Sequence, residues 1–136
     1  MLNEKYHVVV IDDNEDILFM LKTMLQLKGY KVSIKENAEN IEPFIESVLP
    51  DVILMDMLLS GADGREICKN LKENQTIKSI PVIMMSALPQ AEQLCLANGA
   101  NFFLGKPFEM NDLLQTVSKA IASNEDKDND MSAYIQ

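Results

Sequence analysis

The chain has few basic residues, few cysteines and no long apolar run, and each shortage narrows what the protein can be. None of the apolar stretches in its 136 residues approaches the roughly 20 residues that span a bilayer, and the start, MLNEKYHVVV, lacks the pattern of a secretion signal. Twelve basic against twenty-one acidic side chains give a net charge of −9, which disfavours direct binding to nucleic acid or to an anionic membrane. The two cysteines, Cys68 and Cys95, lack the spacing of metal ligands. We therefore expect a cytoplasmic protein with two reduced thiols.

The remaining composition is typical of one globular domain. Hydrophobic residues make up 47% and charged residues 24% of the sequence, and the length suffices for a single hydrophobic core. Residues 123–136 (SNEDKDNDMSAYIQ) turn abruptly polar and acidic. We expect residues 1–122 to form the domain and residues 123–136 to be a disordered acidic tail.

Short apolar runs alternate with amphipathic stretches along residues 1–122. The apolar runs predict five strands, at 7–11, 31–35, 52–55, 80–85 and 101–104. The amphipathic stretches predict five helices, at 14–28, 38–48, 65–73, 90–97 and 110–122. The run KVSIK alternates polar and apolar residues, as an edge strand does. Strands that alternate with helices favour an α/β fold, a doubly wound parallel sheet with helices on both faces.

Polar residues follow four of the five predicted strands. Asp12 and Asp13 come after HVVVI, and Asp56 comes after VILM. Ser86 comes after IPVIMM, and Lys106 comes after NFFL with Gly105 between them. Each residue alone is more simply a helix cap, a turn residue or a solvated lysine. Because the carboxyl ends of parallel strands meet at one edge of the sheet, where open α/β sheets bind ligands, we expect the five side chains to converge.

Three converging carboxylates would repel one another, and a hard divalent cation removes that conflict. Mg²⁺ prefers carboxylate oxygens and retained waters, so the cluster suits this ion. A site with Mg²⁺, a lysine and a nucleophilic carboxylate can accept a phosphoryl group and neutralise its oxygens. This chemistry explains why a buried strand carries Asp56, since an unpaired ionised carboxylate is costly beside a core.

Five short motifs stand in an order and spacing that is specific to one family: IDD at 11–13, LMDM at 54–57, DG at 63–64, MMSA at 84–87 and KPF at 106–108. Together they make the chain resemble the receiver domains of bacterial two-component response regulators, and in particular the single-domain, chemotaxis-regulator type. The resemblance covers residues 5–122. It implies a flavodoxin-like fold whose five parallel strands are ordered 2-1-3-4-5.

The resemblance also implies a phosphoacceptor and a metal site. Asp56 would take a phosphoryl group from the phosphohistidine of a histidine kinase or a phosphotransfer protein, or from a small phosphodonor. Asp13, Asp56 and the backbone carbonyl of Met57 would bind Mg²⁺ directly, and Asp12 would act mainly through water. Such a domain assists its own phosphorylation and dephosphorylation but is not a turnover enzyme.

Three further side chains would respond to the phosphoryl group, again by resemblance. Lys106 would pair with the phosphoryl oxygens, and the peptide bond before Pro107 would be cis. The hydroxyl of Ser86 would move toward the phosphoryl group, and Phe103 would follow as the aromatic switch residue; alternatively, Phe103 is a plain strand residue. The surface around the helices at 90–97 and 110–122 would then change, and this face is our hypothesis for a homodimer contact.

Two positions depart from the family pattern. Ser60 stands where the family often has proline, and we expect the serine to loosen the loop. Asn14 stands where an acidic residue is common.

Leu58 and Leu88 lie two positions after the acceptor and the switch hydroxyl, where side chains of the family border the path of the hydrolytic water. Two apolar side chains should exclude that water, so we expect a slowly hydrolysing aspartyl phosphate.

Other functions fit less well. A flavin binder of similar fold needs a Ser/Thr/Gly-rich loop after the first strand, whereas DDNED would repel phosphate without a metal. An aspartate-based phosphatase would carry a second acid where Leu58 stands. Two alternatives stay open: a scaffold that works without phosphorylation, although such proteins usually lose an acid or the lysine, and a phosphorelay intermediate. The residues after 122 contain no helix-turn-helix, zinc motif or catalytic domain, so we expect an unknown downstream protein to read the signal.

Overall fold

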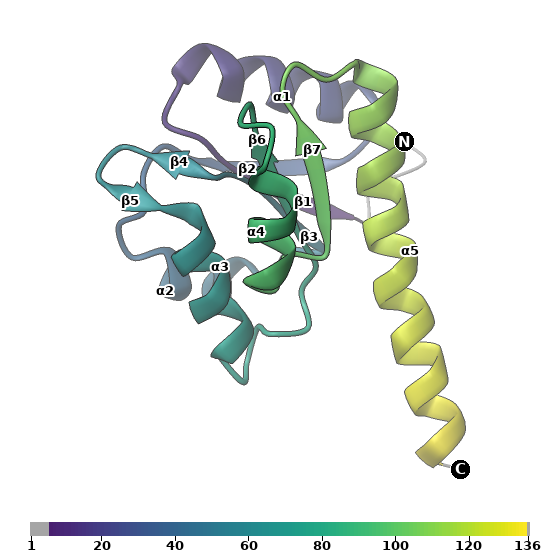
Figure 1. Ribbon diagram of the computed structural model, residues 1–136. Coiled ribbons are helices and arrows are strands. Elements are labelled where there is room, and N and C mark those ends of the chain that lie inside the picture. Colours follow the sequence, from purple (N-terminus) through teal and green to yellow (C-terminus); the bar gives the residue numbers. More distant parts are fainter. Residues whose placement is uncertain (1–5, 136) are drawn as a thin grey trace.

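The computed structural model describes residues 6–135 and the side chains of residues 6–125. Its centre is a five-stranded sheet (Figure 1), made of β1 (His7–Ile11), β2 (Lys31–Lys35), β3 (Val52–Asp56), β6 (Val82–Ser86) and β7 (Phe102–Gly105). All five strands run parallel, in the order β2-β1-β3-β6-β7. Counted along the chain this is the order 2-1-3-4-5, so the predicted fold is confirmed, and KVSIK forms an edge strand as predicted.

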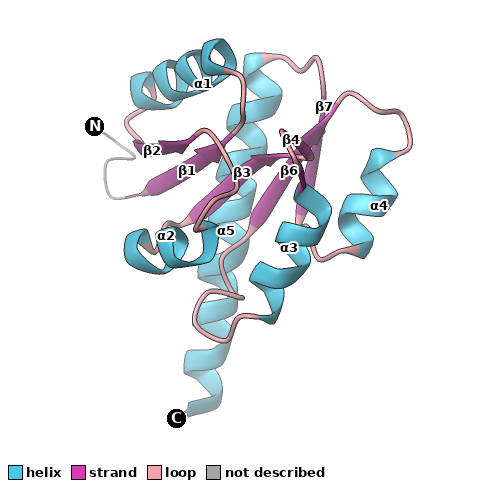
Figure 2. Cartoon of the chain, turned by 90° about the vertical axis from the view of Figure 1, so that its left-hand side faces the viewer, coloured by secondary structure: helices cyan, strands magenta, loops and turns pink. Residues whose placement is uncertain are grey.

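Helices cover both faces of this sheet (Figure 2). One face carries α1 (Glu15–Leu27) and α5 (Met110–Ile135), and the other carries α2 (Ile41–Val48), α3 (Gly64–Glu73) and α4 (Ala91–Ala97). Because both faces are covered, the inner strands are continuous apolar runs rather than alternating ones. None of the helices within the described residues is long and apolar enough to cross a membrane.

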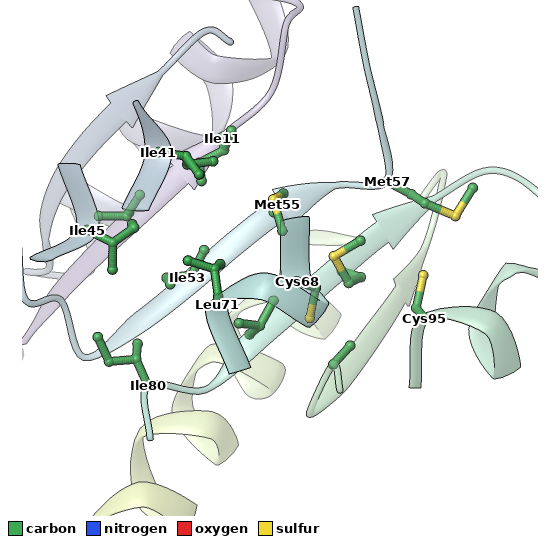
Figure 3. Close-up of a cluster of buried hydrophobic side chains, with 14 of the residues drawn as sticks. Ile11, Ile41, Ile45, Ile53, Met55, Met57, Cys68, Leu71, Ile80 and Cys95 are labelled. Carbon is green, nitrogen blue, oxygen red and sulfur yellow. The ribbon is translucent and has the colours of Figure 1, made fainter. Parts of the chain in front are cut away.

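The sheet divides the core into two clusters. Successive side chains of a strand point to opposite faces, so Val8 and Val10 of β1 pack with α1 and α5. Val9 and Ile11 of the same strand pack with α2, α3 and α4 in the cluster that Figure 3 shows. Burial of both clusters fixes the register of the strands, and therefore which residues leave the sheet at its carboxyl-terminal edge.

Both cysteines are buried in the second cluster, one on α3 and one on α4. Neither forms a disulfide. Burial raises the pKa of Cys68 to about 11, so this thiol stays protonated and unreactive at neutral pH.

Helix α5 is longer than the sequence predicted. We expected it to end at Ala122, but the helix continues to Ile135 and includes residues 123–135 of the segment for which we expected a disordered tail. The segment holds no glycine or proline, and its polarity matters little to a helix with one face in water. The hydroxyl of Tyr6 also donates a hydrogen bond to Glu125, which ties the added turns to the domain. The remaining tail residue, Gln136, and residues 1–5 lie outside the described residues.

A short antiparallel hairpin follows β3 and was not predicted. It consists of β4 (Leu58–Leu59) and β5 (Ala62–Asp63), with Ser60 and Gly61 at its tip. Gly61 has a φ of +75°, a conformation that suits a tight hairpin turn and that glycine adopts without strain. The hairpin carries the chain from the end of β3 to the start of α3, and it places Ser60 at the same edge of the sheet as the acidic residues.

Candidate functional site

The acidic residues at the ends of β1 and β3 converge at the carboxyl-terminal edge of the sheet. Carboxylate oxygens of Asp12, Asp13 and Asp56 lie within 4.8 Å of one another. Lys106, which follows β7, places its Nζ 3.0 Å from Oδ1 of Asp56 and 3.3 Å from Oδ2 of Asp12. The predicted convergence of three acids and one lysine is therefore what the structure contains.

Burial and charge oppose each other in this cluster. The side chain of Asp56 is 13% exposed, and its burial raises its pKa, while the hydrogen bond and charge of Lys106 partly offset that rise. Burial alone would lower the pKa of Lys106, but its contacts with Asp56 and Asp12 raise it. The lysine therefore stays charged, and it serves two carboxylates at once.

Asp12 is held by the loop that begins α1. It is 1% exposed, and its Oδ1 accepts a hydrogen bond from the backbone N–H of Asn14 at 2.9 Å. The side chain of Asn14 in turn caps α1 by accepting from the N–H of Ile17 at 3.0 Å. Asp12 is thus both a turn residue and a member of the site, since its carboxylate accepts from Asn14 and also contacts Lys106. Asn14, the departure from the family pattern, serves as a helix cap.

Asp13 is exposed, and its partner is Ser60 of the hairpin. The backbone N–H and the hydroxyl of Ser60 both donate to Oδ2 of Asp13, at 2.8 and 2.6 Å. The hydroxyl bond is the main cause of a lowered pKa of Asp13. We expected Ser60 to loosen this loop, but the structure shows the opposite arrangement, because serine supplies two donors that fasten the hairpin tip to Asp13.

The backbone below Asp56 requires glycine at position 64. A Cβ atom on Gly64 would lie 2.6 Å from the backbone oxygen of Asp56 and 2.9 Å from that of Met57, closer than atoms can approach. The N–H of Gly64 donates to the Met57 carbonyl at 2.7 Å. A carbonyl oxygen has two lone pairs, so this one retains an acceptor position. The DG motif therefore lets α3 begin directly beneath the site, a role that the motif alone did not reveal.

Ser86 ends β6 beside the acids and is 4% exposed. Its hydroxyl accepts a hydrogen bond from the N–H of Leu88 at 3.0 Å, and its carbonyl accepts from the N–H of Lys106 at 2.8 Å. Ser86 is thus a turn residue that also fixes the loop carrying the lysine. The peptide bond between Lys106 and Pro107 is cis, as the resemblance implied.

The remaining site candidates lie around this edge. Phe103 of β7 is half-buried and packs against the α2–α3–α4 side of the core, which leaves both interpretations of this residue open. Leu58 and Leu88 are both about half exposed, at 55% and 49%. Each stands at the start of a loop or strand next to the acids, on β4 and after β6.

The donor set fits a magnesium ion. Three carboxylates with oxygens within 4.8 Å of one another, one of them solvent-exposed, form a hard oxygen site in which water can complete the coordination. Asp13, Asp56 and the Met57 carbonyl are the residues that could hold the ion directly. Sequence reasoning missed Ser60 as a member of this site, because its contact with Asp13 joins residues 47 positions apart.

Comparison with known proteins agrees with this geometry. The family model of the response regulator receiver domain matches residues 8–118. The chain is 31% identical to YkoG, an uncharacterized transcriptional regulatory protein of Bacillus subtilis, over 97% of this chain and 58% of that protein. It is 30% identical to the nisin biosynthesis regulatory protein NisR of Lactococcus lactis, over 88% of this chain and 52% of that one. The chain thus spans about half the length of the curated relatives it matches.

Solved structures give the same picture. The chemotaxis protein CheY4 of Vibrio cholerae superposes with a TM-score of 0.77 at 27% identity, over 85% of this chain and 98% of that one. The receiver domain of the sensor histidine kinase PA1611 of Pseudomonas aeruginosa superposes with a TM-score of 0.78 at 25% identity, over 86% of this chain and 98% of that one. That domain was solved with a magnesium ion coordinated in its active site cleft.

Proposed function

Because this chain belongs to the receiver domains of two-component response regulators, we propose that it accepts a phosphoryl group on Asp56 in a reaction that requires Mg²⁺. The observation that carries the proposal is the contact of Lys106 with both Asp56 and Asp12 inside the acidic cluster. One lysine cannot balance three carboxylates, so the site is built for additional positive charge and for a ligand rich in oxygen.

The reaction is a transfer of the phosphoryl group between two side chains. A carboxylate oxygen of Asp56 attacks the phosphorus of a phosphohistidine on a kinase or phosphotransfer protein, or of a small phosphodonor. With a phosphohistidine donor, a P–O bond to Asp56 forms while the P–N bond breaks, and the electron pair of that bond stays on the imidazole nitrogen. With a small phosphodonor, the bond from phosphorus to the leaving group breaks instead, and the leaving group keeps the electron pair. Burial raises the pKa of Asp56, while the hydrogen bond and charge of the adjacent Lys106 ammonium oppose that rise and so favour the ionised carboxylate, which is the nucleophile.

Asp13, Asp56 and the Met57 carbonyl would hold Mg²⁺ directly, with Asp12 acting mainly through water. When bound, the ion supplies charge that offsets the oxygens of the incoming phosphoryl group. Asp12 meanwhile keeps the lysine in place, at 3.3 Å. Lys106 can then turn from Asp56 toward a phosphoryl oxygen without leaving the site.

The signal would leave the site through Ser86 and Phe103. A phosphoryl group adds about −1.5 to −2 charges at neutral pH and three strong acceptors. The Ser86 hydroxyl, which now accepts from Leu88, also has a proton to donate to one of those acceptors. Its movement would free space for Phe103 and change the surface of α4, β7 and α5, where a downstream protein or a second copy of the chain would bind.

We infer that the domain passes or stores one phosphoryl group rather than turning over a substrate, and that it works in the cytoplasm. A scaffold that functions without phosphorylation is the alternative. It is disfavoured because Asp12, Asp13, Asp56 and Lys106 are all present and in contact or close to one another. A phosphorelay intermediate would use the same chemistry and differ only in where the phosphoryl group goes next.

Intact mass measurement tests this proposal. The protein incubated with a small phosphodonor and Mg²⁺ should gain one phosphoryl group, and the Asp56→Asn variant should gain none. A gain in both proteins would place the acceptor elsewhere, and a gain in neither would favour the scaffold.

A further inference from the structure

Ser60 and Asp13 form a contact that connects the hairpin β4–β5 with the acidic cluster. Both donors of Ser60 meet the same oxygen, Oδ2 of Asp13, at 2.8 Å from the backbone nitrogen and 2.6 Å from the hydroxyl. Hydrogen bonds to a carboxylate at such distances are charge-assisted and stronger than those between neutral groups. The pair is therefore more than an incidental surface contact.

Asp13 needs such a partner to stay in the cluster. It is exposed, and the charges of Asp12 and Asp56 repel it toward solvent. An unrestrained aspartate would partly populate rotamers that point away from the other acids. With Ser60 bound, the carboxylate is held where one of its oxygens lies within 4.8 Å of an oxygen of each of the other two acids.

We propose that Ser60 is a positioning residue for the metal site: both of its donors bind Oδ2 of Asp13, and Oδ1 is then the oxygen that binds Mg²⁺. The inference rests on the proposed function, since it assumes that Asp13 is a metal ligand. Partners that orient a ligand in this way commonly change metal affinity by 10- to 100-fold, roughly, because the ligand no longer has to be ordered when the ion binds.

The identity of the residue matters here. Proline, which the family often has at this position, carries neither a backbone N–H nor a hydroxyl and could supply neither bond. Alanine keeps the N–H and loses the hydroxyl, whereas threonine keeps both donors. The series from threonine through alanine to proline therefore removes the donors one at a time.

Calorimetric titration with Mg²⁺ tests the proposal on the full chain. Ser60→Ala should weaken Mg²⁺ binding by about tenfold, and Ser60→Pro should weaken it at least as much. Ser60→Thr should bind within about twofold of wild type, since both donors remain. Ser47→Ala is the matched control, because Ser47 is also an exposed serine whose hydroxyl bonds locally, to the carbonyl of Phe44, and it should leave Mg²⁺ affinity unchanged.

Two further measurements separate positioning from folding. Thermal unfolding without Mg²⁺ should show Ser60→Ala within about 2 °C of wild type, because one surface hydrogen bond contributes little to the whole domain. In NMR spectra, the Ser60 amide proton should shift when Asp13 is replaced by alanine, and an unchanged shift would overturn the contact.

The outcomes also distinguish this inference from the proposed function. If wild type binds no Mg²⁺, or if Asp13→Ala binds it as tightly as wild type, the metal site itself is wrong. If wild type binds Mg²⁺ and Asp13→Ala does not, but Ser60→Ala binds like wild type, only the role of Ser60 is overturned. Threonine binding as weakly as alanine would overturn it as well.

Discussion

The two edges of the sheet differ in how far the charges of their polar residues are balanced. At the amino-terminal edge, the N–H of His7 donates to Oδ2 of Asp51 at 2.7 Å, and the His7 ring nitrogen Nε2 lies 2.7 Å from the Ser33 hydroxyl. Burial and the charge of Lys31 lower the pKa of His7, which keeps the ring neutral at pH 7. His7, Asp51 and Ser33 thus have local partners, and the charges of Lys31 and Asp51 act on His7 in opposite directions.

The carboxyl-terminal edge leaves its charges unbalanced. Asp12, Asp13 and Asp56 lie together with one lysine, so the cluster carries a surplus of negative charge. Both edges are rich in hydrogen bonds, and polarity alone does not tell them apart. The difference teaches that a site for a charged ligand is marked by groups that the fold brings together without neutralising them.

The largest expected difference between the two edges is in phosphoryl uptake: removing divalent cations from the acidic edge should slow it, whereas a substitution at the opposite edge should not. With excess EDTA, phosphoryl uptake from a small phosphodonor should slow by at least about 100-fold, because the acids lose the charge that offsets the incoming oxygens. The measurement is the rate of mass gain with and without EDTA. Asp51→Ala, at the opposite edge, should take up the phosphoryl group at the wild-type rate in Mg²⁺, and a loss of uptake in this variant would break the comparison.

Replacing Lys106 by methionine should destabilise the domain in a way that Mg²⁺ repairs. The side chains of Asp12 and Asp56 are 1% and 13% exposed, and among the described residues Lys106 is the cation that forms an ion pair with them. We expect the free energy of unfolding in urea to fall by about 2 kcal/mol in EDTA and to recover when Mg²⁺ is added.

Lys31→Met is the control for this experiment, since Lys31 is an exposed lysine at the amino-terminal edge. It should change stability by less than about 0.5 kcal/mol, with or without Mg²⁺. If Mg²⁺ stabilised both variants equally, the ion would not be replacing the charge of Lys106.

Neutralising one acid at each edge should change stability in opposite directions. Burial raises the pKa of Asp56 above 3.8, its value in an unfolded chain, so its charged form is disfavoured in the folded state. Folding therefore loses free energy as pH rises through this pKa range, and the loss persists at pH 7. In EDTA at pH 7, Asp56→Asn should raise the free energy of unfolding by about 1 kcal/mol.

Asp51→Ala should instead lower the free energy of unfolding by about 1 kcal/mol or more, because it leaves the N–H of His7 without its acceptor. Urea titrations at pH 7 measure both changes. Below pH 3 the gain from Asp56→Asn should vanish, since Asp56 is then protonated in both states. The same sign for both variants would mean that the edges do not differ electrostatically.

The smallest effect concerns the leucines at the rim of the acidic edge. Replacing Leu58 and Leu88 together by asparagine should speed the loss of the phosphoryl group several-fold, because polar side chains admit and orient water. The decay of the phosphorylated mass measures this rate. Leu27→Asn, which changes an exposed leucine at the end of α1, should leave the rate unchanged, and equal decay in all proteins would refute the idea.

Much of this molecule could be read from the sequence because its inner strands are buried on both faces. After His7, the run HVVVI has no further polar residue, and VILM has none, so the acids that come next mark the sheet edge directly. The second helix, predicted from residue 38, begins at Ile41 instead, which places Pro43 in its first turn, where proline fits. The five site residues named from strand ends all lie at the carboxyl-terminal edge.

The errors have equally specific causes. Strands β4 and β5 have two residues each, too few for any periodicity to be visible. The acidic composition of residues 123–135 suggested disorder, although nothing in that segment breaks a helix. The contact between Ser60 and Asp13 depends on a hairpin that folds over the end of another strand, and such tertiary contacts leave no local pattern.

The acidic cluster and its lysine and serine stand at the ends of four strands, β1, β3, β6 and β7, so no short segment of the chain could form the site alone. Local unfolding of any of these four connections would scatter the nucleophile, the acids and the lysine before the rest of the domain melts. The capacity to take up a phosphoryl group would therefore report the fraction of molecules whose four loops are simultaneously intact. Phosphoryl uptake measured at increasing denaturant concentration would show whether the four loops unfold together. Helix content would not show this, because it reports the helices rather than the loops.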